Sequence, residues 1–184
     1  MDEFEWNQYA LIAYLSEKMK SNPQFGKTAL QKIIYILQEV YNVRCRYRFS
    51  LYSYGPYCSE LPADLDAVSS IEGVNVVPVV SGYGGFRILP GAKCDLVKAK
   101  GKAFIAENKN RIDAVVDTFG NFSARDLELR ATIIYCCKGM ADSGKPASET
   151  DLNKTVQQIK PKFPENEIKE AICELFTSKA CSIN

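Results

Sequence analysis

The chain has 184 residues, a length typical of one domain or of one domain with a helical extension, and its 23 Lys and Arg nearly balance its 22 Asp and Glu. A near-neutral charge argues against a dedicated nucleic-acid coat or a polybasic membrane binder, because both need an excess of positive charge. The count of zero His removes Ser-His-Asp and Cys-His catalysis, histidine metal ligation and imidazole pH switching together.

The seven cysteines include no C-x-x-C pair, so neither a zinc ribbon nor a thioredoxin-type motif is indicated. The chain starts with acidic residues where a signal peptide would be basic, and no apolar run reaches the roughly 18 residues that span a bilayer. We therefore expect a cytoplasmic protein with reduced thiols, no metal and no cofactor. The adjacent Cys136 and Cys137 are expected to be buried on a helix rather than to sense redox state.

Apolar residues recur at helical spacing in the first part of the chain and predict helices over about 4–20 and 28–42. Thr28 followed three residues later by Gln31 is typical of a capping box at the start of the second helix.

From position 47 the apolar period changes from helical spacing to two, which predicts a strand over 47–54 that ends at Gly55-Pro56. Ser59 is expected to cap a helix over 59–70, with Pro62 in its first turn, where a missing N–H costs nothing.

Two β-rich runs, 74–80 and 86–89, flank a glycine-rich segment and predict a hairpin. The order helix, helix, strand, helix, hairpin is typical of a winged helix, with 59–70 in the position of the recognition helix and 74–89 as the wing. The sequence thus predicts an α+β, mainly helical fold that begins with a winged-helix-like unit.

After Pro90-Gly91 the pattern is almost wholly helical, with helices expected to start at Ser123 and Pro164 and a loop expected over 139–148. We expect a winged-helix-like unit over 1–92 and a helical C-terminal subdomain over 93–184. The core can run continuously across this boundary, which would make the chain one domain.

Three segments resemble a known family signature, and the Tyr-Gly-Pro-Tyr turn is the most specific part of it. They are Leu30-Gln31-Lys32-Ile33-Ile34-Tyr35-Ile36-Leu37, Tyr47-Arg48-Phe49 and Tyr54-Gly55-Pro56-Tyr57-Cys58-Ser59-Glu60-Leu61. The chain resembles the Panacea domain of SocA-like antitoxins and, more closely, the YwgA-like prokaryotic proteins, over about residues 5–90. The resemblance implies a non-enzymatic protein-binding module, either an antitoxin-like neutraliser of a toxin or a regulatory adaptor.

Tyrosine and arginine gather around that turn, and these residue types dominate the hot spots of protein interfaces. The predicted partner-binding residues are Arg48, Tyr52, Tyr54, Tyr57, Glu60 and Asp64. The alternative is that most of the aromatic rings fill the core with their hydroxyl groups at its rim.

A winged helix could instead bind nucleic acid through Arg44, Arg46, Tyr83 and Arg87. The segment 59–70 in the recognition position carries three carboxylates and neither Lys nor Arg, and carboxylates repel phosphates. We therefore rank this alternative below protein binding.

The sequence offers little for catalysis. The segment Gly82-Tyr83-Gly84-Gly85 lacks the spacing of a phosphate-binding loop, and a cysteine nucleophile would need a base other than histidine. We expect a protein partner, no membrane and no enzymatic activity.

Overall fold

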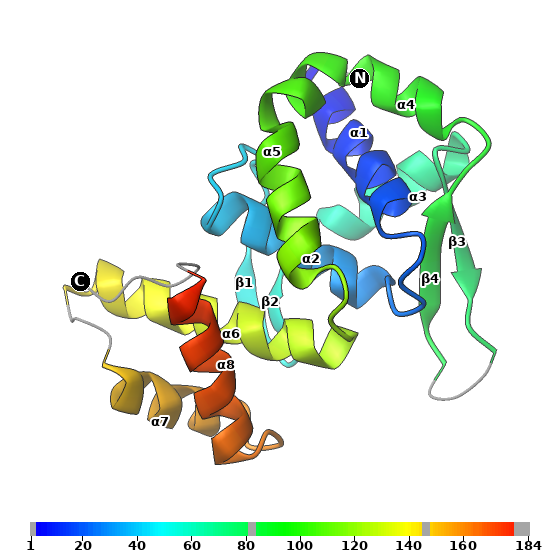
Figure 1. Cartoon of the computed structure of the whole chain (residues 1–184). Helices are drawn as coiled ribbons and strands as arrows, with labels where there is room; N and C mark the ends of the chain where they lie inside the picture. The colour runs from blue at the N-terminus through cyan, green and yellow to red at the C-terminus, as the bar shows by residue number, and fades with distance from the viewer. Residues whose placement is uncertain (1–2, 81–83, 145–147, 179–184) are drawn as a thin grey trace.

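The computed structural model describes residues 3–80, 84–144 and 148–178. Within these ranges the chain forms eight helices and two separate two-stranded antiparallel sheets (Figure 1), which confirms the mainly helical prediction. The elements are α1 (Glu3–Lys18), α2 (Lys27–Glu39), β1 (Ser50–Tyr52), β2 (Gly55–Tyr57), α3 (Leu61–Ser70), β3 (Val74–Pro78), β4 (Phe86–Pro90), α4 (Cys94–Lys100), α5 (Lys102–Phe119), α6 (Ala124–Asp142), α7 (Glu149–Ile159) and α8 (Glu165–Thr177).

Three helices form the centre of the core. Helices α1, α2 and α6 are buried on every side over residues 9–16, 29–37 and 127–134. A helix segment that is buried on every side must be surrounded by other elements. Helices α4 and α5 lie against α1, and α6 lies against α2, so the hydrophobic cluster includes residues from both sides of position 92.

The start of α2 differs from the prediction. The helix begins at Lys27 after Gly26, so the expected capping box of Thr28 and Gln31 is wrong. Gln31 is buried and its amide hydrogen-bonds the backbone of Cys58, which removes it from any capping role. The predicted start at Ser123 is confirmed, since its side chain caps α6 in a capping box with Asp126.

The predicted strand over 47–54 is only partly correct. Residues 50–52 form β1. Gly55–Tyr57, where the predicted strand was expected to end, forms a second strand that pairs with β1 in a hairpin, with Ser50 opposite Tyr57. Residues 43–48 alternate between buried odd and exposed even positions as a strand would. They are nevertheless not part of either sheet, because the Gln38 side chain pairs with both the N–H and the carbonyl of Tyr47.

Helix α3 and the second hairpin follow in the expected order. Glu60 occupies the N-cap position, so the predicted Ser59 cap is wrong, while Pro62 does lie in the first turn. Strands β3 and β4 pair with Val74 opposite Pro90 and form a sheet of their own, which shares no strand with β1–β2.

The C-terminal part adds a helical pair to one end of the molecule. Helix α6 continues to Asp142, which corrects the expected loop over 139–148, and α7 and α8 pack against α6 and each other (Figure 1). Within the described ranges, every helix is too short or too polar to cross a bilayer.

Candidate protein-binding surface

We call residues 52–57, from the last residue of β1 to the last residue of β2, the tyrosine turn. Buried polar side chains fix this turn to α2. Lys32 Nζ donates to the Pro56 carbonyl oxygen at 2.5 Å. Gln31 accepts from the Cys58 N–H at 2.9 Å and donates to its carbonyl at 2.8 Å. Because Lys32 and Gln31 are neighbours on one helix, two consecutive residues of α2 determine where the turn lies.

A second set of charged side chains fixes the other side of the turn. Glu128 of α6 and Lys160 are almost fully buried and form an ion pair at 2.7 Å, and Lys160 Nζ also donates to the Ser53 carbonyl. Lys162 adds a second ammonium at 2.9 Å from the other Glu128 oxygen. We refer to Lys32, Glu128 and Lys160 as the buried charge cluster.

Gly55 meets the geometric needs of this position. Its φ of +81° lies in the left-handed region, and a Cβ there would come within 2.8 Å of the Thr132 hydroxyl and 3.3 Å of the Glu128 carbonyl oxygen. A residue with a side chain would be strained and would separate the turn from α6. The glycine of the signature is thus required for close packing of the turn.

Two aromatic rings project from this fixed turn into solvent. Tyr52 is 62% exposed and Tyr54 is 66% exposed, whereas Tyr57 is half-buried and packs edge-on against Tyr52 with 5.5 Å between ring centroids. Lys162 Nζ lies 5.2 Å from the centre of the Tyr54 ring. The alternative that the aromatic rings fill the core holds for Tyr47 but not for Tyr52 and Tyr54.

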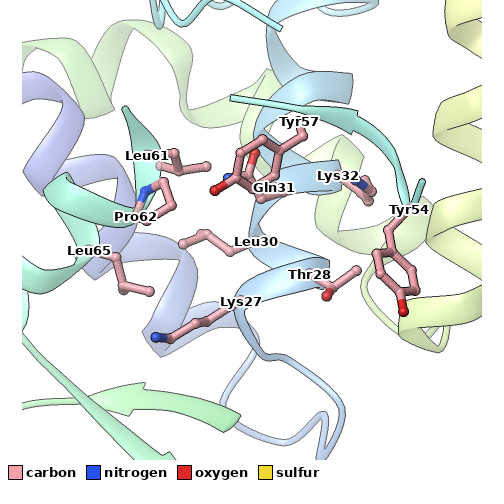
Figure 2. A pocket seen from close by; sticks show the side chains of 10 residues that line it. All are labelled: Lys27, Thr28, Leu30, Gln31, Lys32, Tyr54, Tyr57, Leu61, Pro62 and Leu65. Carbon is pink, nitrogen blue, oxygen red and sulfur yellow. The ribbon is translucent and has the colours of Figure 1, made fainter. Parts of the chain in front are cut away.

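A pocket of about 350 Å³ opens beside the turn, between α2 and α3 (Figure 2). Its walls are mainly apolar and come from three elements, and its lining residues are Lys27, Thr28, Leu30, Gln31, Lys32, Tyr54, Tyr57, Leu61, Pro62 and Leu65. We call it the turn pocket.

Two lysines give the turn pocket a positive side. Burial lowers the pKa of Lys32 to about 8, although the nearby Glu128 carboxylate opposes this shift. Lys27 is exposed, and its Nζ lies 4.4 Å from the centre of the Phe86 ring of β4. The pocket therefore presents apolar surface with cations along α2.

The remaining predicted partner-binding residues lie outside the lining of the turn pocket. Arg48 and Glu60 are exposed and do not line the turn pocket. Asp64 accepts a hydrogen bond from the Tyr47 hydroxyl at 2.7 Å, and burial raises the pKa of its carboxyl group while that hydrogen bond lowers it. Asp64 thus links α3 to the segment before β1.

The contribution of α2 to the turn pocket was not predicted from the sequence. Lys27, Thr28 and Leu30 come from the first turn of this helix, which the sequence predicted as a helix start and not as part of a site. The available signal was polar Gln31 and Lys32 inside an apolar run, since buried polar side chains need a partner.

The predicted nucleic-acid-binding residues are divided between two parts of the structure. Arg87 of β4 donates to the Lys20 carbonyl oxygen at 2.6 Å, beyond the end of α1. Arg44 and Arg46 are exposed and line a second pocket beside α5. Tyr83 lies outside the described residues.

The described cysteines and acidic residues form no metal-binding group of three or more. Cys136 and Cys137 are buried, as predicted, and burial raises the pKa of the Cys136 thiol to about 11. A thiol with such a pKa is a poor nucleophile at neutral pH.

Comparison with models of protein families gave no match, and a search among curated proteins gave none either.

Proposed function

We propose that this protein is a non-enzymatic protein-interaction module, an antitoxin-like neutraliser or a regulatory adaptor, that binds its partner through the tyrosine turn and the turn pocket. The observation that supports this most is the exposure of Tyr52 and Tyr54 on a turn whose backbone is fixed by buried side chains. Rigid aromatic rings bind partners with a small loss of conformational entropy, because little has to be ordered on association.

The surface favours a partner segment of particular chemistry. An apolar side chain would fill the turn pocket against Leu30, Leu61 and Leu65, and an adjacent carboxylate would face the ammonium groups of Lys27 and Lys162. The resemblance of residues 5–90 to the Panacea domain and the YwgA-like proteins is consistent with a toxin or another regulated protein as the source of that segment. The proposal places the complex in the cytoplasm.

The alternative, a winged-helix regulator that binds nucleic acid, has less support. Helix α3 would be the recognition helix, yet its exposed positions include Asp66, and exposed Glu60 precedes it. Arg87 of the proposed wing is already hydrogen-bonded to the Lys20 carbonyl oxygen, just after α1. Phosphates would meet carboxylates on this helix.

The proposal is tested by capture of the tagged protein from its native lysate after nuclease treatment, with the same experiment on Tyr54→Ala. We expect a stoichiometric protein that wild type retains and the variant binds at least about thirtyfold more weakly, because a hot-spot aromatic contributes about 2 kcal/mol or more. Arg48→Ala and Tyr52→Ala should weaken binding in the same direction.

Leu96→Ala is the control, since Leu96 is a large apolar residue of α4 that is 65% exposed and does not line the turn pocket. Equal loss of the partner from Leu96→Ala and Tyr54→Ala would contradict a surface at the tyrosine turn. Salt-dependent capture of nucleic acid, without a protein that survives nuclease, would favour the winged-helix alternative.

A further inference from the structure

A second pocket, of about 690 Å³, lies between the segment before β1, the start of α1 and helix α5, and the proposed protein-binding function does not use it. Its lining residues are Phe4, Asn7, Gln38, Asn42, Val43, Arg44, Arg46, Phe104, Glu107, Asn108 and Arg111. We call it the arginine pocket, because three guanidinium groups from two distant segments of the chain meet there.

The segment that carries Arg44 and Arg46 is fixed by its buried odd-numbered neighbours. Gln8 donates to the Cys45 carbonyl at 3.0 Å, and Gln38 pairs with both backbone groups of Tyr47 at 2.9 Å. With 45 and 47 buried, positions 44 and 46 point outward along the pocket wall.

The arginine side chains are also positioned by neighbours. The guanidinium carbon of Arg46 lies 4.2 Å from the centre of the Phe4 ring. Arg111 donates to the Asn108 side chain at 3.2 Å, and Asn108 is itself 3% exposed and donates to the Phe104 carbonyl at 2.9 Å. The two walls thus hold their charges in defined places before any ligand binds.

One lining residue has an unfavourable backbone conformation. Arg46 has a φ of +58°, in the left-handed region, which costs a residue with a side chain roughly 1–2 kcal/mol. Such strain is retained where the surrounding structure imposes it, and it concentrates at ligand-binding positions.

The charge of the arginine pocket is not balanced within the described residues. Arg125 and Arg130 each pair with a carboxylate, but Arg44, Arg46 and Arg111 form no ion pair with any described residue. Glu107 is the acidic group in the lining, against three arginines. Three cations around one hollow favour an anion inside it.

We propose that the arginine pocket binds a nucleoside phosphate. Guanidinium groups match phosphate oxygens with paired hydrogen bonds, which makes arginine the preferred residue for this group. The Phe104 ring offers apolar surface to a flat base, and the Asn7 and Asn42 amides can pair with its polar edge. The volume lies within the usual range for small-molecule sites and accommodates a single nucleotide rather than a duplex.

The test is calorimetric titration of the full chain with ADP, GDP, adenosine and inorganic phosphate at low ionic strength. We expect a nucleotide to bind, adenosine to bind at least about tenfold more weakly and inorganic phosphate also more weakly, because the phosphate and the ring both contribute. A 5′-phosphorylated oligothymidine and its 5′-hydroxyl counterpart distinguish a free nucleotide from the phosphorylated end of a strand.

Arg46→Gln and Arg111→Gln should each weaken the bound nucleotide about tenfold or more, since a charged hydrogen bond is lost. Arg48→Gln removes the same charge from the same segment outside the pocket lining and should leave the affinity unchanged. Glu107→Gln should strengthen binding, which loss of structure would not do. The thermal midpoint of each variant shows that it folds.

Binding of the free nucleotide supports the proposal, and so does binding of the oligothymidine that depends on its 5′-phosphate. Failure of both to bind would overturn it. Equal affinity for ADP and adenosine, or equal loss from Arg48→Gln and Arg46→Gln, would also overturn it. None of these outcomes depends on whether the tyrosine turn binds a protein.

Discussion

The two hairpins of this protein are both short and antiparallel, yet they are attached to the helical core in different ways. The β1–β2 hairpin is fixed by side chains, chiefly the buried charge cluster of Lys32, Glu128 and Lys160. The β3–β4 hairpin is attached chiefly through backbone atoms: the Ile88 N–H donates to the Phe25 carbonyl at 2.8 Å, and Gly26 lies directly against the Phe86 carbonyl. The Arg87 side chain adds one hydrogen bond, to the Lys20 carbonyl oxygen.

This difference determines what each hairpin is sensitive to. Attachment through buried charges fails when one charge is removed, because its partners are left unpaired in a region of low dielectric constant. Attachment through backbone tolerates changes in side-chain charge and fails when a side chain is inserted between the two backbones. Both hairpins expose aromatic rings, but the hairpin that carries Tyr52 and Tyr54 depends on buried charges that must all remain paired.

Removal of the central carboxylate is expected to have the largest effect on stability. Glu128→Gln keeps the shape of the side chain but leaves Lys160 without a carboxylate in a site where it is only 2% exposed. Breaking such a pair costs about 3–5 kcal/mol. Urea denaturation should show this loss in the free energy of unfolding, or the variant should fail to fold.

Glu165→Gln is the control for Glu128→Gln. Glu165 pairs with Lys169 at 2.7 Å on the surface, where both side chains are more than half exposed, and such a pair contributes little to stability because water screens it. A loss for Glu128→Gln as small as that of Glu165→Gln would contradict the role assigned to the buried charge cluster.

A smaller loss is expected where the β3–β4 hairpin meets the loop before α2. In Gly26→Ala, the new Cβ would lie 2.0 Å from the Phe86 carbonyl oxygen, so the hairpin has to move away from the loop. Such overpacking costs about 1–3 kcal/mol. Thermal unfolding should show the loss, and hydrogen exchange of the Ile88 amide should become faster.

Gly139→Ala provides the matched control for this substitution. Gly139 lies inside α6 with no atom within 4 Å of its added Cβ, so alanine should stabilise the protein by about 0.5–1 kcal/mol. Unchanged exchange at Ile88 in Gly26→Ala would show that the hairpin does not depend on this close contact.

The helical part of the fold was accessible from sequence because amphipathic spacing and caps are local signals. Ser123 shows this, since it is the predicted helix start and its hydroxyl forms a capping box with Asp126, three residues on. The first hairpin was not accessible in the same way. Its second arm contains Gly55-Pro56, which indicates a turn locally, and only contacts with Lys32 and Thr132 from distant segments place it in a strand.

For the candidate sites too, the sequence showed which residues are present, and the tertiary structure determined where they lie. The aromatic content of the tyrosine turn was visible in the sequence, but the exposure of Tyr52 and the burial of Tyr47 depend on how residues 43–49 lie against Gln38. Arg44 and Arg46 were visible as charges on alternate positions. Arg111 follows them by 65 positions or more, so only the tertiary structure could place it in the same pocket.

The smallest expected effect is a dependence on pH that belongs to the β1–β2 hairpin. Burial lowers the pKa of Lys32 to about 8 from its ordinary value of 10.5, so between these values the unfolded chain binds more protons than the folded one. The free energy of unfolding therefore rises with pH through this window as the penalty for the buried ammonium is relieved. Relative to Lys32→Met, wild type should gain about 1 kcal/mol between about pH 7 and about pH 9.

Lys98→Met is the control for this pH dependence. Burial opposes the shift at Lys98, but hydrogen bonds with Asp95 and Glu17 raise its pKa, so its contribution to stability is complete below pH 10.5 and lost only above it. The difference between wild type and Lys98→Met should be constant from about pH 7 to about pH 9. A constant difference for Lys32→Met as well would mean that the Lys32 ammonium keeps its proton, and the hairpin would then be attached by a permanent charge instead of one that titrates near neutral pH.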